Sequence, residues 1–370
     1  MFTHEEITQI EAHGLSVAAV ERQIENFRNG FPALPVVRAA AGGDGVKQLD
    51  AESVKERETY YNDNLKNIKT LKFVPASGAA TRMFKELFEY VNDDKRTAGI
   101  DKLIVNLEKF AFFPELAKYL QPQIDDKDVV RNIIIDGLEY GAKPKGLVTF
   151  HAYKDGARKP VEEHLVEAAL YASSNGEANI HFTVSPEHQA GFEALLAERQ
   201  SHYEQKFNVK YNVSFSIQSP ATDTIAVNPD NTPFRTDDGK LLFRPAGHGA
   251  LIYNLNNIED ELVSIKNIDN VANERFLPTT AKYKKVLMGK ALELRDKIFG
   301  YLEELDRVCN IIPGSRPLVP ICPGYDSLYE DINTSEEALA LCNDIEAFLK
   351  EELCIELPEA ETPKQRVIQI

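Results

Sequence analysis

At 370 residues the chain is longer than one ordinary hydrophobic core, so the sequence predicts two domains, or one large domain with additions. Apolar residues make up 43% of the chain and charged residues 27%, which is typical of a globular protein and excludes a largely disordered one. The net charge of −16 disfavours nucleic acid and anionic membrane surfaces as general partners, because both would be repelled.

The N-terminal residues 1–6 contain neither a basic region nor an apolar segment, so we expect no secretory signal and a cytoplasmic protein. No stretch approaches the ~20 consecutive apolar residues that cross a bilayer, so we expect no membrane partner. The spacings of the cysteines match neither a zinc site nor a redox motif, and we expect reduced thiols. The cysteines are Cys309, Cys322, Cys342 and Cys354.

Residues 1–70 are predicted to form a helical N-terminal segment. The side-chain oxygens of Ser16 and Asp50 can each accept a hydrogen bond from the first turn of a helix. One of these helices is expected to stop at Gly30 and the other near Asn67. The residues between the two helices are rich in Pro, Ala and Gly, which is typical of a loop or linker.

Residues 71–275 are predicted to form an α/β domain with a helical insertion at about residues 84–140. Strands are expected at residues 72–74, 147–150, 179–185, 211–217, 240–243 and 262–266. Helices are expected at residues 81–91, 100–110, 128–138, 161–173, 186–207 and 250–256. This alternation indicates a Rossmann-like, mixed but mostly parallel sheet that is covered on both faces. Residues 276–370 are predicted to be a mainly helical C-terminal region, with helices at residues 282–307 and 335–353.

The first candidate site is the turn of small residues that follows the strand at residues 72–74. Ligands of open α/β sheets bind beyond the carboxyl ends of the strands. Main-chain N–H groups in this turn can approach an anion at the positive end of the next helix, and Arg82 adds a planar, permanent charge. A tight structural turn also favours small residues, so both interpretations stay open. The turn consists of Ser77, Gly78, Ala79, Ala80, Thr81 and Arg82.

The second candidate is Lys145, which lies with Lys143 on either side of a proline and precedes a predicted strand. A solvated loop is the alternative interpretation. Polar side chains then crowd residues 151–167, and this segment includes His164 on the predicted helix. A histidine in such a position is more typical of a surface or half-buried site than of catalysis.

Two further loops carry unusual residues. Gly247 and Gly249 flank His248 after a strand, and this arrangement lets a ligand approach the main chain beside a titratable ring. Asp269 lies between two amide side chains at the end of the last strand. It is a natural ligand for Mg²⁺, which takes one or two carboxylates and completes its coordination with water and phosphate oxygens. An exposed turn and an Asx turn are the respective alternatives.

Taken in chain order, these motifs resemble the UTP–sugar-1-phosphate uridylyltransferase group, which includes the UDP-N-acetylhexosamine pyrophosphorylases. The motifs are Gly78 to Arg82, Pro144-Lys145-Gly146, Thr183-Val184-Ser185-Pro186, Gln218, Pro245-Ala246-Gly247-His248-Gly249 and Asn267-Ile268-Asp269-Asn270. The last two are the most specific. The chain also looks like an uncharacterised bacterial family of unknown function that shares the Gly-His-Gly-Ala-Leu-Ile and Asn-Ile-Asp-Asn segments.

The resemblance implies a fold of the nucleotide-diphospho-sugar transferase (GT-A) type and a Mg²⁺-dependent nucleotidyltransferase. Its partners would be a nucleoside triphosphate, with UTP favoured, and a sugar phosphate. Arg82 and Lys145 would neutralise charge on the phosphates, and Asp269 would hold the Mg²⁺. Main-chain groups of the first turn would bind phosphates, whereas Gln218 and the Gly247–His248–Gly249 segment would face the base. The products would be a nucleotide sugar and pyrophosphate.

The chain departs from that group at several points. Ser77 and Ala80 replace glycines of the first turn, and a long helical stretch separates Arg82 from the next motif. No motif supplies a second metal-binding carboxylate, so Asp326 and Asp331 are candidates by location only. These departures keep a second interpretation open, namely a nucleotide or sugar-phosphate binding protein without turnover. A third is a glycosyltransferase that uses a finished nucleotide sugar. The oligomeric state stays open.

Overall fold

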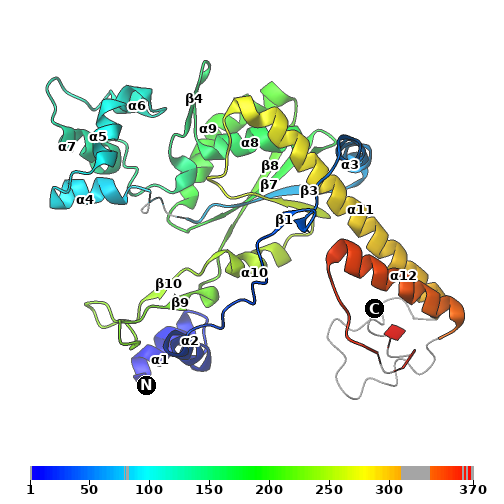
Figure 1. Cartoon of the computed structure of the whole chain (residues 1–370). Helices are drawn as coiled ribbons and strands as arrows, with labels where there is room; N and C mark the ends of the chain where they lie inside the picture. The colour runs from blue at the N-terminus through cyan, green and yellow to red at the C-terminus, as the bar shows by residue number, and fades with distance from the viewer. Residues whose placement is uncertain are drawn as a thin grey trace. The chain divides into compact units, whose positions relative to one another are not determined.

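The computed structural model describes residues 2–78, 80, 83–309, 334–360, 362–363 and 366–367. It contains two compact units, Met1–Met288 and Gly289–Ile370. Figure 1 shows the elements in chain order. The described candidate site residues all lie in the first unit.

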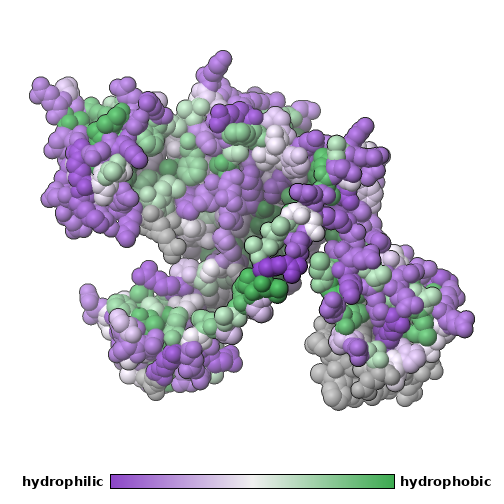
Figure 2. All heavy atoms as spheres, in the orientation of Figure 1, coloured by the Kyte–Doolittle hydropathy of each residue, from purple (hydrophilic) through white to green (hydrophobic). Residues whose placement is uncertain are grey.

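The N-terminal segment is helical, as the sequence predicts. Its helices are α1 (His4–Ala12), α2 (Val17–Asn29) and α3 (Ala51–Asn64), and the short strands β1 (Ala41–Gly42) and β2 (Gly45–Val46) lie between the last two. The predicted caps are confirmed, because Ser16 and Asp50 accept hydrogen bonds from the N–H groups of Ala19 and Ser53. Figure 2 shows hydrophobic side chains along the extended segment after α2, where Leu34 and Val37 are exposed.

Four parallel strands form the main sheet in the order β11-β3-β7-β8. They are β3 (Thr70–Pro75), β7 (Glu177–Val184), β8 (Lys210–Ile217) and β11 (Leu262–Ile265), and β6 (Ser173–Ser174) adds a short antiparallel edge to β7. The predicted α/β fold is therefore confirmed. The chain passes from β3 through β7 to β8 and then returns to the opposite side of β3 as β11. The strand order consequently reverses between β3 and β11.

Helices cover both faces of this sheet (Figure 1). Helices α8 (Pro160–Tyr171) and α9 (Gln189–Phe207) pack on the face that includes Val74, Ile180 and Phe182. The short 3₁₀ turn η7 (His248–Leu251) and α10 (Ile252–Asn256) pack on the other face, where Leu251 contacts the cluster of Leu71 and Phe73. All six residues of β3 are buried, as expected for a central strand of a parallel sheet.

The predicted insertion has a hydrophobic core of its own, which includes Ala80, Ile100, Leu116, Val130 and Val148. Its helices are α4 (Lys85–Asp93), α5 (Ala98–Val105), α6 (Phe113–Leu116) and α7 (Asp126–Arg131), and α7 continues as a π-helical turn over Asn132–Asp136. The helices expected at residues 100–110 and 128–138 are therefore shorter than predicted. A 3₁₀ turn at Leu107–Lys109 follows α5, and the π-helical turn follows α7.

Two predicted strands are wrong. Residues 147–150 form no strand, because Lys145–Leu147 is a 3₁₀ turn (η5) and Val148 is buried in the core of the insertion. The next strands, β4 (His151–Tyr153) and β5 (Gly156–Arg158), form a separate hairpin. The strand expected at residues 240–243 is β10 (Phe243–Arg244), which pairs with β9 (Thr224–Ile225) outside the main sheet. These short strands pack against α1 and α2 through Ile225 and Leu241.

The long helix α11 (Leu277–Cys309) passes from the first unit into the second. In the second unit, α12 (Glu336–Leu353) and the end of α11 form a cluster that includes Leu305, Leu341 and Cys342. Among the helices that the structure describes, none is both long and apolar enough to cross a membrane.

Candidate functional site

The carboxyl ends of the four parallel strands bring the predicted site segments to one edge of the sheet. Ser77 follows β3, Gln218 follows β8 and Asp269 follows β11. Ligands of open α/β sheets bind at this edge, where the strand order reverses. The reversal between β3 and β11 therefore marks the most favourable position for a ligand.

Lys145 and Asp269 form an ion pair at that position, with Nζ 2.5 Å from Oδ2. Both side chains are about one-third exposed, so a ligand can reach them. The neighbouring residues explain how the pair forms. A Cβ atom on Gly146 would lie 2.7 Å from Cζ of Phe192 and 3.2 Å from Cγ1 of Ile268. Only glycine lets the two chain segments approach so closely, and their contact places Lys145 beside Asp269.

Helix α8 supports the loop that carries Asp269 through a buried hydrogen bond. Nε2 of His164 lies 3.2 Å from the carbonyl oxygen of Ile268, and a carbonyl can only accept, so the ring donates. Burial, followed by the charge of Lys72, lowers the pKa of His164 well below its usual value and keeps the ring neutral. His164 is completely buried, so the expected surface or half-buried position was wrong. Its role is to support the loop.

A buried ionic network lies one helical turn further along α8. The carboxylate of Glu167 accepts hydrogen bonds from Lys72 at 2.9 Å, Lys266 at 2.5 Å and the hydroxyl of Tyr171 at 3.0 Å. Burial would raise the pKa of Glu167, but the charges of Lys72 and Lys266 and the hydrogen bond from Lys266 lower that pKa to about 2. Glu167 is therefore a carboxylate at neutral pH and ties β3 and β11 to the helix.

This network was not predicted from the sequence. A signal was present, because Lys72 lies in the middle of the buried strand β3. A lysine in a strand that is buried on both faces needs an acidic partner. The sequence alone does not identify that partner as Glu167.

The turn after β3 is only partly described. The hydroxyl of Ser185 donates to the carbonyl oxygen of Ser77 at 3.1 Å, which joins this turn to the end of β7. Gly78 is exposed, and a Cβ atom there would meet no atom within 4 Å. Ala80 is completely buried in the core of the insertion, so its side chain serves packing. The predicted residues Ala79, Thr81 and Arg82 lie outside the described residues, as do Asp326 and Asp331.

Gln218 and the glycine–histidine–glycine segment lie side by side. The amide nitrogen of Gln218 donates to the carbonyl oxygen of Ala246 at 3.3 Å and to Oγ1 of Thr222 at 3.2 Å. Gly247, His248 and Gly249 are exposed, and a Cβ atom on either glycine would meet open space. The packing that the structure describes does not require these glycines. A ligand that approaches the main chain would require them.

Asp269 is the predicted site residue at this edge whose carboxylate could hold a metal ion. The described residues contain no group of three His, Cys, Asp or Glu side chains that could do so. Mg²⁺ is commonly held by one or two carboxylates together with substrate phosphates and water. A metal ion at Asp269 would therefore need further ligands from a bound phosphate or water.

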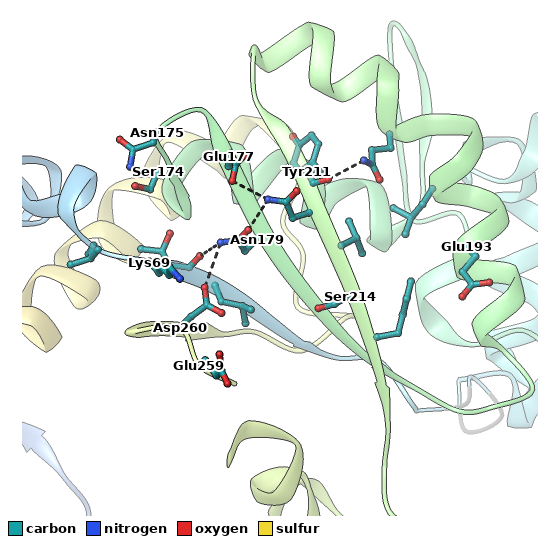
Figure 3. Close-up of a pocket in the computed structure, with 18 residues that line it drawn as sticks. Lys69, Ser174, Asn175, Glu177, Asn179, Glu193, Tyr211, Ser214, Glu259 and Asp260 are labelled. Atoms are coloured by element: carbon teal, nitrogen blue, oxygen red, sulfur yellow. Dashed lines mark hydrogen bonds between the residues drawn. The ribbon is translucent and has the colours of Figure 1, made fainter. Parts of the chain in front are cut away.

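A large groove lies elsewhere, along the edge strand β8 near the amino ends of the strands (Figure 3). Its volume is about 990 Å³. Its polar side chains are bonded to one another: Asn212 donates to Glu177 at 3.2 Å and to Asn179 at 3.0 Å, and Asn179 donates to Asp260 at 3.5 Å. Amino ends of parallel strands are not the usual ligand edge, so volume alone does not make this groove the site.

Comparison with known proteins identifies the family. Residues 3–311 match the family described as "Domain of unknown function (DUF4301)". Among curated proteins, none matches the sequence. Among solved structures, the chain is similar to the uridine diphosphate N-acetylglucosamine pyrophosphorylase from Trypanosoma brucei in complex with an inhibitor, with 14% identity and a TM-score of 0.36. The similarity covers 66% of this chain and 39% of that one, so this chain spans well under half of its length. The chain belongs to the DUF4301 family.

Proposed function

We propose that this member of the DUF4301 family is a nucleotidyltransferase of the GT-A type. It would transfer a nucleotidyl group, uridylyl for preference, from a nucleoside triphosphate to a sugar 1-phosphate and release pyrophosphate. The observation that carries the proposal is the Lys145–Asp269 pair, because two opposite charges separated widely in the sequence meet at the reversal of strand order. The order of the motifs along the chain supports it independently.

The pair suits phosphate chemistry. In the absence of a ligand the ammonium and the carboxylate neutralise each other. When a nucleotide enters, Lys145 can exchange the carboxylate for a phosphate oxygen, and Asp269 becomes available to a Mg²⁺ ion. That ion would supply charge neutralisation on the phosphates. The chain's own contribution is to position the nucleotide at the rim of the sheet and to hold a positive charge beside it.

A binding protein without turnover is the second candidate, and three observations favour it. The amide of Gln218 is bonded to Ala246 and Thr222 rather than directed to a ligand. The side chain of Ala80 serves the core of the insertion. Among the described residues, Asp269 belongs to no group of three or more His, Cys, Asp or Glu side chains that could hold a metal ion. Such a protein would retain Mg²⁺-dependent nucleotide affinity and release no pyrophosphate.

A ligand panel separates these candidates. Melting temperature would be measured with UTP, ATP, CTP, GTP, dTTP, UDP-GlcNAc and UDP-glucose, each with and without Mg²⁺. A ligand at about 100 times its Kd adds about 2.7 kcal/mol of stability. A Mg²⁺-dependent rise with UTP, together with pyrophosphate release when a sugar 1-phosphate is added, supports the transferase. A rise without release supports the binding protein, and no rise with any nucleotide contradicts both.

A further inference from the structure

A second polar cluster lies where the β4–β5 hairpin meets the first turn of α8. Glu163 on α8 is completely buried, and two side chains of β4 contact its Oε1 atom. Nδ1 of His151 lies 2.9 Å from this oxygen, and the hydroxyl of Tyr153 donates to it at 2.6 Å. Arg158 on β5 faces the other oxygen, with Nη1 3.7 Å from Oε2. None of these residues belongs to the Lys145–Asp269 pair.

The chain that leaves Asp269 leads directly to this cluster. Glu274 follows Asp269 by five residues, and its N–H group donates to the hydroxyl of Tyr153 at 3.1 Å. Its carboxylate lies 3.6 Å from Arg158. The segment of residues 269–274 therefore connects the Lys145–Asp269 pair to this cluster.

The two ring nitrogens of His151 have different environments. Nδ1 faces the buried carboxylate, whereas Nε2 makes no hydrogen bond within the part of the chain that the structure describes. The side chain is 19% exposed, so the free edge of the ring is accessible. A histidine that donates Nδ1–H to a carboxylate keeps a lone pair on Nε2, and the carboxylate stabilises the imidazolium that forms when Nε2 takes a proton.

A salt bridge closes the other side of the cluster. Oε2 of Glu163 and Nη1 of Arg158 are buried and make no hydrogen bond among the described residues, but they face each other at 3.7 Å. Glu163 therefore holds the ring of His151 on one side, while Arg158 faces it on the other.

The other titratable groups that face Glu163 do not compete with His151 for a proton. Burial, followed by the hydrogen bond to Glu163, raises the pKa of Tyr153 and keeps the phenol protonated. Burial alone would lower the pKa of Arg158, but the charge of Glu163 raises it, so the guanidinium stays charged. Arg158 also faces Asp155 at 3.4 Å and Glu274 at 3.6 Å.

We propose that His151 is the proton acceptor for the second substrate and that Glu163 positions it. The proposal rests on the proposed function, and the acceptor is the monoanion of the sugar 1-phosphate, whose phosphate still carries one proton. The proton of this O–H group passes to Nε2 of His151 while the oxygen forms its bond to the α-phosphorus. The bond from the α-phosphorus to the bridging oxygen breaks, and pyrophosphate leaves with its electron pair.

The first test is the pH profile of kcat/KM for the wild type, His151→Gln and Glu163→Gln. Loss of a general base lowers the rate by about 10²–10⁴-fold where the acceptor phosphate carries its second proton, which is below about pH 6. His151→Gln should therefore steepen the acidic limb of the profile and leave kcat/KM near the wild-type value at higher pH. An equal fall at every pH would contradict proton transfer from the phosphate monoanion. Wild-type turnover and an unchanged acidic limb in His151→Gln would overturn the proposal.

The matched control is Glu162→Gln. Glu162 precedes Glu163 on α8 and is also buried, but its carboxylate is bonded to Arg199 and Tyr203 rather than to His151. This variant should retain the wild-type pH profile. A melting temperature for each variant separates loss of folding from loss of the base. If Glu162→Gln alters the acidic limb as Glu163→Gln does, the effect belongs to α8 in general and the proposal is wrong.

The second test does not require turnover. Carbethoxylation by diethylpyrocarbonate, mapped by mass spectrometry, should modify His151 and leave the buried His164 and His181 intact. Addition of UTP, Mg²⁺ and a sugar 1-phosphate should protect His151. If nucleotides bind but His151 stays unprotected, this inference fails and the proposed function stands. If no nucleotide binds in the ligand panel, the proposed function fails first.

Discussion

A single glycine explains much of the candidate site. Gly146 has no side chain, and this allows its main chain to pack against Phe192 and Ile268. That contact brings Lys145 to Asp269. The motif of a lysine followed by a glycine is therefore one structural unit, in which the second residue positions the first.

Gly146→Ala should destabilise the protein by about 1–3 kcal/mol, because the added methyl group overlaps the buried ring of Phe192. Urea denaturation measures this change. Gly249→Ala is the matched control, since a methyl group there meets open space. It should leave the free energy of unfolding almost unchanged and weaken nucleotide binding, because a ligand could no longer approach the main chain. Equal stability of the two variants would contradict the packing argument.

Among the elements of the first unit, helix α8 contacts several of the segments that carry the candidate site residues. Its buried face carries Glu163, which contacts the β4–β5 hairpin, His164, which supports the Asp269 loop, and Glu167, which binds lysines of β3 and next to β11. The sequence indicates a polar segment here but not its partners, since these come from distant strands. A local sequence pattern does not show which side chains from distant segments form pairs in the folded protein.

Glu167→Gln should cost about 3–5 kcal/mol at pH 7, because it leaves buried lysines without their carboxylate. The pKa of Glu167 falls from 4.5 to about 2 in the folded state, so its contribution is present above pH 4.5 and is lost as the pH falls towards 2. Urea denaturation at a series of pH values should show the difference from the wild type shrinking over that interval. Glu89→Gln, at an exposed ion pair, should show little difference at any pH. A constant penalty for Glu167→Gln would contradict the assigned charge.

The strands also show where local pattern succeeds and fails. The strands β3, β7, β8 and β11 were predicted with ends within two residues of the observed ones. The run at residues 147–150 is equally apolar, but Val148 is buried by the insertion instead. An apolar run in the sequence indicates that a segment is buried, but it does not identify the part of the chain that covers it. Lys145 meets Asp269 because the chain at Gly146 packs against Phe192 and Ile268, and this contact between distant segments was not predicted from the sequence.

At the scale of the whole molecule, the family match and the two units divide the chain differently. The match covers residues 3–311, which includes nearly all of the first unit and only the start of the second. The described site residues lie in the first unit. We therefore expect the proposed nucleotide site to depend on the first unit.

Leu341→Asp tests this division. Leu341 is buried in the cluster that α12 forms with the end of α11, so a carboxylate there should lower the melting temperature of the second unit strongly. Nucleotide affinity, measured below that temperature, should stay at the wild-type value. Loss of affinity in this variant would show that the second unit contributes to the site.

We propose that the rim between β3 and β11 binds nucleotide phosphates with Mg²⁺. Isothermal titration calorimetry of UTP tests this proposal with the wild type, Asp269→Asn and, as the control, Asp260→Asn, which alters the groove beside β8. We expect Mg²⁺-dependent binding by the wild type and Asp260→Asn, and loss of the Mg²⁺ dependence with Asp269→Asn. Unchanged binding by Asp269→Asn, or loss of binding by Asp260→Asn alone, would contradict it.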